Sequence, residues 1–219
     1  MSRKAIDMGA EHELSLFLDE YFYNRLLQNN KIVSFERIKD KSLQIQGIDV
    51  IITTKKSTVN IDEKAQLYYI NQGLPTFAFE VNFLNKNGAL SPGWLYNKNL
   101  LTDYFVLIWL TATHNNLQEI KAEDFINAEC MMIKKTEIIN YLSGVGYTEK
   151  LIEKIAMDLR SQEQYGKYII PDQTDFYFYF SPPDNYSEQP INIVIRKNLL
   201  IRLAVRIYVV SKNKLARIK

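Results

Sequence analysis

Two carboxylates and one lysine are spaced in this chain as they would be in a hydrolytic site. Asp49 lies in the apolar run Gly47–Ile52, and thirteen positions later comes the triplet Asp62-Glu63-Lys64. Burying a bare carboxylate costs several kcal/mol unless a counter-charge or a metal ion compensates it. An aspartate in so apolar a segment therefore indicates such a partner.

The expected elements bring these side chains together. In a strand over Ser57–Ala65, alternation sends Asp62 and Lys64 to one face and the residue between them to the other. The strand expected before it, over Leu43–Thr53, carries Asp49, and a short turn joins it to the strand over Ser57–Ala65. We therefore expect two carboxylates and one ammonium to converge on a single point.

Such a point suits a divalent cation. Hard cations take oxygen ligands and are usually held by one or two carboxylates together with a phosphate oxygen. A water bound to the cation becomes a better nucleophile near neutral pH. An ammonium on the same face, here that of Lys64, adds electrostatic stabilisation of developing negative charge.

The other elements indicate an α/β protein. A helix is expected over Ala10–Leu27 and a strand over Ile32–Ile38. The almost continuously apolar segment Asp103–Thr111 predicts a strand covered on both faces. Further strands are expected at 76–83, 130–133, 175–180 and 191–195, with helices at 136–142 and 148–160 and either type at 199–210.

The order helix, strand, Asp-bearing strand and Asp-x-Lys strand resembles the PD-(D/E)xK nuclease superfamily over roughly residues 9–110. The resemblance implies a central mixed β-sheet flanked by helices, a restriction endonuclease-like core followed by a C-terminal α/β extension. It also implies Asp49 and Asp62 as ligands of Mg²⁺ or Mn²⁺, with Lys64 orienting the attacking water. The proline of the family motif is absent, since Gly47 and Ile48 precede Asp49.

The family often carries a glutamate on its first helix, some residues after a glycine. Gly9 and Glu13 match that arrangement best, with Glu11 as the competitor. A helix separates the two glutamates by about 200°, so only one can face the site; we choose Glu13. Gln66, two residues after the lysine, occupies a position that the superfamily sometimes uses near the phosphate, and it is a further candidate.

A second acid-x-lysine triplet, Glu119-Ile120-Lys121, satisfies the same short pattern. Its surroundings are polar, and no apolar strand bearing an aspartate precedes it. We therefore expect this second triplet to lie on the surface.

The charge of +2 is unevenly distributed. From residue 191 to the end there are eight cations and no acid, so the rest of the chain carries 2 − 8 = −6. A basic segment beside an acidic pocket favours a polyanion such as DNA as the partner, although a solvated basic face is an alternative. We divide the chain into a nuclease-like core, residues 1–115, and an extension, residues 116–219, that includes the basic segment.

Composition is that of a globular protein, with 47% apolar and 24% charged residues. The single cysteine, Cys130, excludes an internal disulfide and predicts a buried thiol in a reducing cytoplasm. Met1–Glu13 has no apolar segment typical of a secretory signal. The apolar stretches 104–112 and 199–210 are too short or too interrupted by arginine to span a membrane as helices.

The sequence thus predicts a magnesium-dependent DNA endonuclease that hydrolyses phosphodiester bonds. One alternative is a catalytically inactive module of the same fold that binds nucleic acid or a protein partner. Another is a subunit whose site is completed by a second chain. The oligomeric state stays open, a homodimer being one of the arrangements.

Overall fold

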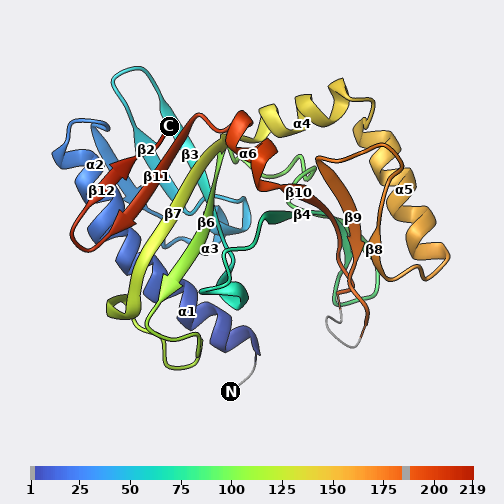
Figure 1. Cartoon of the computed structure of the whole chain (residues 1–219), viewed down its shortest axis with the longest axis horizontal. Coiled ribbons are helices and arrows are strands. Elements are labelled where there is room, and N and C mark those ends of the chain that lie inside the picture. Colours follow the sequence, from blue (N-terminus) through green and yellow to red (C-terminus); the bar gives the residue numbers. More distant parts are fainter. Residues whose placement is uncertain (1–2, 184–187) are drawn as a thin grey trace. The chain divides into compact units, whose positions relative to one another are not determined.

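The chain folds as two compact units, each assembled from separate segments, in a computed structural model that describes residues 3–183 and 188–219 (Figure 1). Unit 1 comprises Met1–Leu74, Leu101–Lys134 and Ala204–Lys219, and unit 2 comprises Pro75–Leu100 and Lys135–Leu203. The predicted boundary at residue 115 differs from this division. Strands on its two sides, β6 (Tyr104–Ala112) and β7 (Phe125–Lys134), pair along their whole length and stay in one unit.

Unit 1 contains a seven-stranded sheet in the order β1-β2-β3-β6-β7-β11-β12. Its other strands are β1 (Ser34–Arg37), β2 (Val50–Thr53), β3 (Thr58–Ala65), β11 (Arg206–Ser211) and β12 (Leu215–Arg217). The pair β3 and β6 is parallel, and every other neighbouring pair is antiparallel. The expectation of an α/β protein with a mixed sheet is confirmed.

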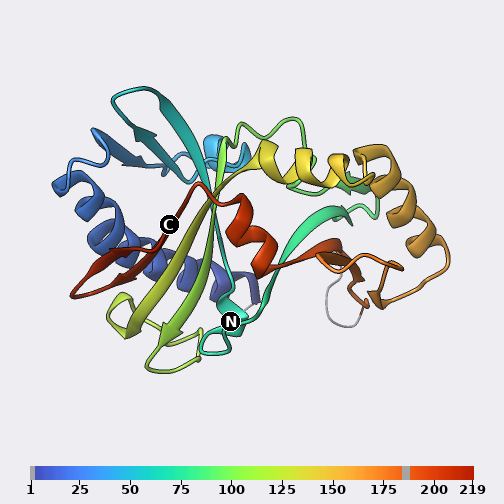
Figure 2. The ribbon, with the colours of Figure 1, turned by 45° about the horizontal axis from the view of Figure 1, so that its top comes forward.

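One long helical segment covers a face of this sheet. Helix α1 (Arg3–Leu18) continues through a π-helical turn, η1 (Asp19–Tyr23), into α2 (Asn24–Gln28). Both views show α1 running across the strands (Figures 1 and 2). Its apolar side chains, including the fully buried Phe17 and Phe22, pack with the inward residues of β2, β3, β6 and β7. The expected helix over Ala10–Leu27 is confirmed, although it begins earlier.

Strand β6 is buried on both faces, as its apolar sequence predicts. From Phe105 to Leu110 every side chain is buried. Its parallel neighbour β3 carries Asp62, which is 1% exposed, and Lys64, whose side chain is 30% exposed.

Unit 2 contains an antiparallel five-stranded sheet in the order β5-β4-β10-β9-β8. Its strands are β4 (Thr76–Leu84), β5 (Leu90–Pro92), β8 (Gly166–Tyr168), β9 (Phe176–Phe180) and β10 (Ile191–Arg196), and its helices are α4 (Lys135–Gly144), α5 (Glu149–Ser161) and α6 (Lys197–Leu203). The Thr148 side chain caps α5. In β9 the three phenylalanines are buried and the two tyrosines are half-buried, so the aromatic alternation serves packing.

The strand predicted over Leu43–Thr53 is wrong in its first half. Residues Lys41–Ile45 form the short helix α3, and β2 begins only at Val50. The Asp40 side chain accepts a hydrogen bond from Ser42 N (2.7 Å) and caps α3. A five-residue helix is too short to show helical periodicity in the sequence, so only its cap indicates it.

The basic C-terminal segment is not one continuous tail. Residues 191–203 belong to unit 2, and residues 204–219 belong to unit 1. The stretch Leu199–Val210, for which the sequence left both types open, ends helix α6 and then enters strand β11.

In the part of the chain that the structure describes, no helix combines the length and the apolar character that crossing a membrane requires.

Candidate functional site

The hairpin of β2 and β3 brings the side chains of Asp49 and Asp62 together. The register pairs Val50 with Ile61, and the N–H of Asp49, the residue just before β2, also donates to Ile61 O (2.8 Å). The regular ladder is therefore interrupted at Asp49, but its carboxyl group still lies close enough to Asp62 for the two to interact.

Gly47 fixes the direction from which Asp49 enters the hairpin. Its φ of 72° is in the left-handed region, which residues with a side chain avoid at a cost of roughly 1–2 kcal/mol. Gly47 N donates to Gln44 O (2.9 Å), and Ile48 N donates to Leu43 O (3.2 Å). These two bonds close the end of α3 as a Schellman motif.

The Asp62 carboxylate is buried and only partly satisfied. Its residue is 1% exposed, and Lys64 Nζ lies 2.5 Å from Asp62 Oδ1. The second oxygen, Oδ2, is buried and has no hydrogen-bond partner among the described residues. Asp49 Oδ2, by contrast, accepts a hydrogen bond from Glu63 N (2.7 Å). One oxygen of this buried carboxylate therefore lacks a donor among the described residues.

The charges of the site are strongly coupled. The pKa of Asp49 is raised to about 6: burial is the main cause, the charge of Asp62 and a hydrogen bond with it add to the rise, and Lys64 and the Glu63 N–H oppose it. For Lys64, burial alone lowers the pKa, but Asp62 and Asp49 outweigh burial and raise the pKa above its ordinary value. Lys64 therefore stays cationic at neutral pH and cannot serve as a general base there.

Glu13, the helix glutamate predicted for the site, is held by partners elsewhere, whereas the charges of Lys64 and Asp49 act on Glu11. Glu13 Oε2 accepts from Ala122 N (3.0 Å), and Lys121 Nζ lies 3.3 Å from Glu13 Oε1. The Ala122 N–H is the main reason that the pKa of Glu13 lies below its ordinary value. The second acid-x-lysine triplet thus supplies the lysine that holds Glu13 elsewhere.

Glu11 interacts with the site through charge. Desolvation raises the pKa of Glu11, Lys64 lowers it, and Asp49 raises it again. Because Glu11 and Glu13 point about 200° apart around the helix, the contact that holds Glu13 against Ala122 turns Glu11 toward Lys64. Which of the two glutamates turns toward Lys64 depends on the position of η3 (Ala122–Asp124). The spacing of residues in the helix does not predict where this distant segment lies.

Gln66 follows directly after β3, two residues past Lys64. Its N–H donates to Ile108 O (3.1 Å), which continues the pairing of β3 with β6. Gln66 therefore lies at the end of β3, close in sequence to Lys64, as expected. Its contact with a phosphate stays a prediction.

A charged network on the opposite face of β3 was missed from the sequence. Glu63 accepts hydrogen bonds from Tyr23 OH (2.7 Å) and from Arg37 Nη1, and Arg37 Nη2 also donates to Asp19 Oδ1 (2.7 Å). Burial raises the pKa of Glu63, and Arg37 opposes that shift. The signal available in the sequence was Glu63 itself, an acid on the inward face of β3, which indicates a buried partner. The partners, however, come from η1 and β1.

The donor set fits a divalent cation of the magnesium type. Two carboxylates from adjacent extended segments converge, and Asp62 Oδ2 is left without a donor among the described residues. Mg²⁺ is usually held by one or two carboxylates and otherwise by water and phosphate oxygens. Within 3–183 and 188–219, no group of three or more His, Cys, Asp and Glu side chains is arranged to hold a metal. A two-carboxylate site is the arrangement that the residues allow.

Comparisons with models of protein families, with curated proteins and with solved structures find no match to this chain. Any functional conclusion therefore depends on the side chains of the site.

Proposed function

We propose that this chain is a metal-dependent nuclease that hydrolyses phosphodiester bonds of DNA through Asp49, Asp62 and Lys64. The family resemblance stated above suggests the substrate, and the geometry of the hairpin supports the chemistry. The proposal depends on one observation in particular: Asp62 Oδ2 is buried, lacks a donor among the described residues, and lies beside a second carboxylate.

That observation is unfavourable for a purely structural aspartate. A buried polar atom without a hydrogen bond costs about 1–3 kcal/mol, and a neighbouring carboxylate adds repulsion, as the raised pKa of Asp49 indicates. A cation between the two carboxylates removes both penalties. Lys64 offsets only part of them, because its ammonium lies against the other oxygen of Asp62.

Each residue then has a separate role. Asp49 and Asp62 hold the cation, which when bound lowers the pKa of a coordinated water and polarises the phosphodiester. Lys64 remains protonated and supplies positive charge where negative charge develops on the phosphoryl oxygens. The Glu63 N–H fixes the orientation of Asp49, and Glu11 adds negative charge near the cation.

The decisive experiment is cleavage of supercoiled, linear duplex, branched and single-stranded DNA by Asp62→Asn in Mg²⁺, Mn²⁺ or EDTA. We expect cleavage by the wild type with metal and a loss of at least about 100-fold in the variant, similar to the loss of one key electrostatic contact in other enzymes. The melting temperature should stay equal or rise, because the variant removes carboxylate repulsion. Glu119→Gln, at an exposed position of the second triplet, whose central Ile120 is buried, is the matched control and should cleave normally.

Full cleavage by Asp62→Asn would reject the assignment. The competing interpretation is an inactive module of this fold. It is favoured because, among the described residues, no group of three or more His, Cys, Asp and Glu side chains could hold a metal ion. Isothermal titration with Mn²⁺ separates the two. Binding that Asp62→Asn abolishes supports the nuclease, and no binding at millimolar metal supports the module.

A further inference from the structure

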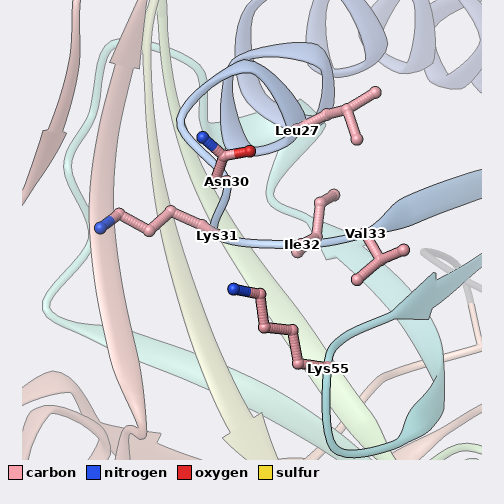
Figure 3. A pocket seen from close by; sticks show the side chains of 6 residues that line it. All are labelled: Leu27, Asn30, Lys31, Ile32, Val33 and Lys55. Atoms are coloured by element: carbon pink, nitrogen blue, oxygen red, sulfur yellow. The ribbon is translucent and has the colours of Figure 1, made fainter.

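A basic pocket lies in unit 1 at the turn end of the β2–β3 hairpin. Its volume is about 230 Å³, and its lining residues are Leu27, Asn30, Lys31, Ile32, Val33 and Lys55 (Figure 3). The volume exceeds that of several liquid waters at about 30 Å³ each. The pocket has no part in the proposed chemistry, so its composition calls for a separate explanation.

One wall is the turn that ends α2. Asn30 has a left-handed backbone, with φ at 53°. Asn30 N donates to Leu27 O (2.9 Å), and Lys31 N donates to Leu26 O (2.9 Å). Val33 N then donates to Thr53 O (2.7 Å) and ties the segment to β2. The backbone positions of the lining residues are thus fixed by hydrogen bonds.

The other wall is the turn of the hairpin. Thr54 N donates to Ser57 O (2.8 Å), and Thr54 Oγ1 accepts from the N–H groups of Lys56 and Ser57. This turn carries Lys55, whose ammonium points toward the backbone of Lys31 and Ile32 in Figure 3. A tight turn therefore presents one lysine to a segment that carries another.

The pocket has positive charge without compensation inside the described part of the chain. No acidic residue lines it, and neither lysine ammonium has a hydrogen bond or an ion pair among the described residues. Figure 3 draws the Lys31 ammonium directed away from Lys55, so an anion in the pocket gains from both cations when the long Lys31 side chain turns toward it. The apolar side chains of Leu27 and Val33 offer a surface for a non-polar group attached to that anion.

We propose that this pocket binds a backbone phosphate of DNA, with the attached sugar against its apolar wall. The inference rests on the proposed function and adds a binding contact to it. Phosphate contacts by lysine position a nucleic acid and supply affinity without reading its sequence. The pocket is thus a positioning site outside the catalytic residues.

The hairpin sets the spacing between the two sites. Six steps along the hairpin lead from the level of Asp49 and Asp62 to the turn at Lys55 and Lys56, which at about 3.3 Å per step is roughly 20 Å. The pocket is therefore a contact at a distance from the catalytic residues.

The test is DNA binding by the double variant Lys31→Gln/Lys55→Gln in EDTA, measured by fluorescence anisotropy of a labelled duplex over a range of salt concentrations. Each lost phosphate contact reduces the slope of log K against log salt by about 0.9. We expect a slope reduced by about 1 to 2 and roughly tenfold weaker binding at moderate salt. Lys150→Gln/Lys154→Gln removes the same charge from exposed positions of α5 and should bind like the wild type.

Equal slopes for the two double variants would overturn the inference. Lys31 follows the carboxyl end of α2, where a cation also favours the helix dipole, so the melting temperature of each variant is measured first. If Lys31→Gln is unstable, Lys55→Gln alone should still lower the slope by about 0.9, because Lys55 lies in the hairpin turn.

The outcomes separate the two proposals. Salt-dependent DNA binding that the pocket variant weakens, in a protein that cleaves no DNA form, retains the pocket and rejects the nuclease. Metal-dependent cleavage by the wild type, with no change of slope in the pocket variant, rejects the pocket and retains the nuclease. A titration with inorganic phosphate distinguishes a free anion from DNA: saturation by phosphate at micromolar concentration would assign the pocket to the free anion instead.

Discussion

Both faces of strand β3 carry charged side chains, but the two carboxylates differ in how fully they are hydrogen-bonded. On one face, Glu63 has both oxygens engaged by Tyr23 and Arg37. On the other face, Asp62 has one oxygen against Lys64 and the other without a partner in the described residues. Because the residues are neighbours in sequence, burial by itself does not explain the difference.

This contrast separates two ways of burying charge. A buried ion pair is tolerated when hydrogen bonds satisfy its remaining atoms, and the network around Glu63 meets that condition. The cluster around Asp62 does not meet it, and burial together with the adjacent Asp62 raises the pKa of Asp49. Such a cluster costs stability, which supports the proposal that it binds a ligand.

Breaking the satisfied face should have the largest effect. Arg37→Met leaves Glu63 buried without its cation, and removing one partner of a buried pair typically costs 3–5 kcal/mol, so we expect a loss of roughly 3 kcal/mol in the free energy of unfolding. Urea denaturation measures it. Asp62→Asn, one position along the strand, is the matched variant on the other face and should lose nothing.

The two variants together test the contrast itself. Equal destabilisation by Arg37→Met and Asp62→Asn would mean that both faces are structural. The double variant Arg37→Met/Glu63→Leu should recover part of the loss, because it leaves no uncompensated charge.

The unsatisfied face should make stability depend on pH in the opposite sense to an ordinary salt-bridged aspartate. The pKa of Asp49 rises from 3.8 to about 6 on folding, so the folded state binds this proton more tightly than the unfolded state. The stabilisation of the folded state by this proton is complete below pH 3.8 and is lost as the pH rises through about 6. Its size is on the order of 3 kcal/mol, because each pKa unit between 3.8 and about 6 corresponds to about 1.4 kcal/mol.

The measurement is the free energy of unfolding of wild type and Asp49→Asn in EDTA between pH 4 and pH 8. Other carboxylates, such as Glu13 with its lowered pKa, act in the opposite direction, so the difference between the two proteins is the informative quantity. We expect Asp49→Asn to gain relative to the wild type as the pH rises. Parallel curves would contradict the burial of an ionised Asp49.

The smallest expected effects separate the two helix glutamates. Glu11→Gln should weaken Mn²⁺ binding a few-fold and leave stability nearly unchanged, because Glu11 acts on the site only through charge. Glu13→Gln should leave Mn²⁺ binding unchanged and lower stability by less than about 1 kcal/mol, since it weakens a surface ion pair. Isothermal titration and thermal melting measure both. The reverse pattern would restore Glu13 to the site.

Local pattern was sufficient where the chemistry followed from alternation. The convergence of Asp49 and Asp62 and the direction of Lys64 follow from a two-residue period and an antiparallel hairpin. The burial of β6 follows from its unbroken apolar run. The short helix α3 was not found, although Asp40 and Gly47 mark its two ends, because a five-residue helix offers only its caps as a signal.

The sequence by itself determined the charged content of β3 and the face on which each charge lies, because neighbouring side chains in a strand must point in opposite directions. Only the tertiary structure decided which of those charges are satisfied. The guanidinium that engages Glu63 comes from β1, and the backbone N–H that removes Glu13 from the site comes from η3. Both partners are distant along the chain and are brought close by packing, which no local period encodes.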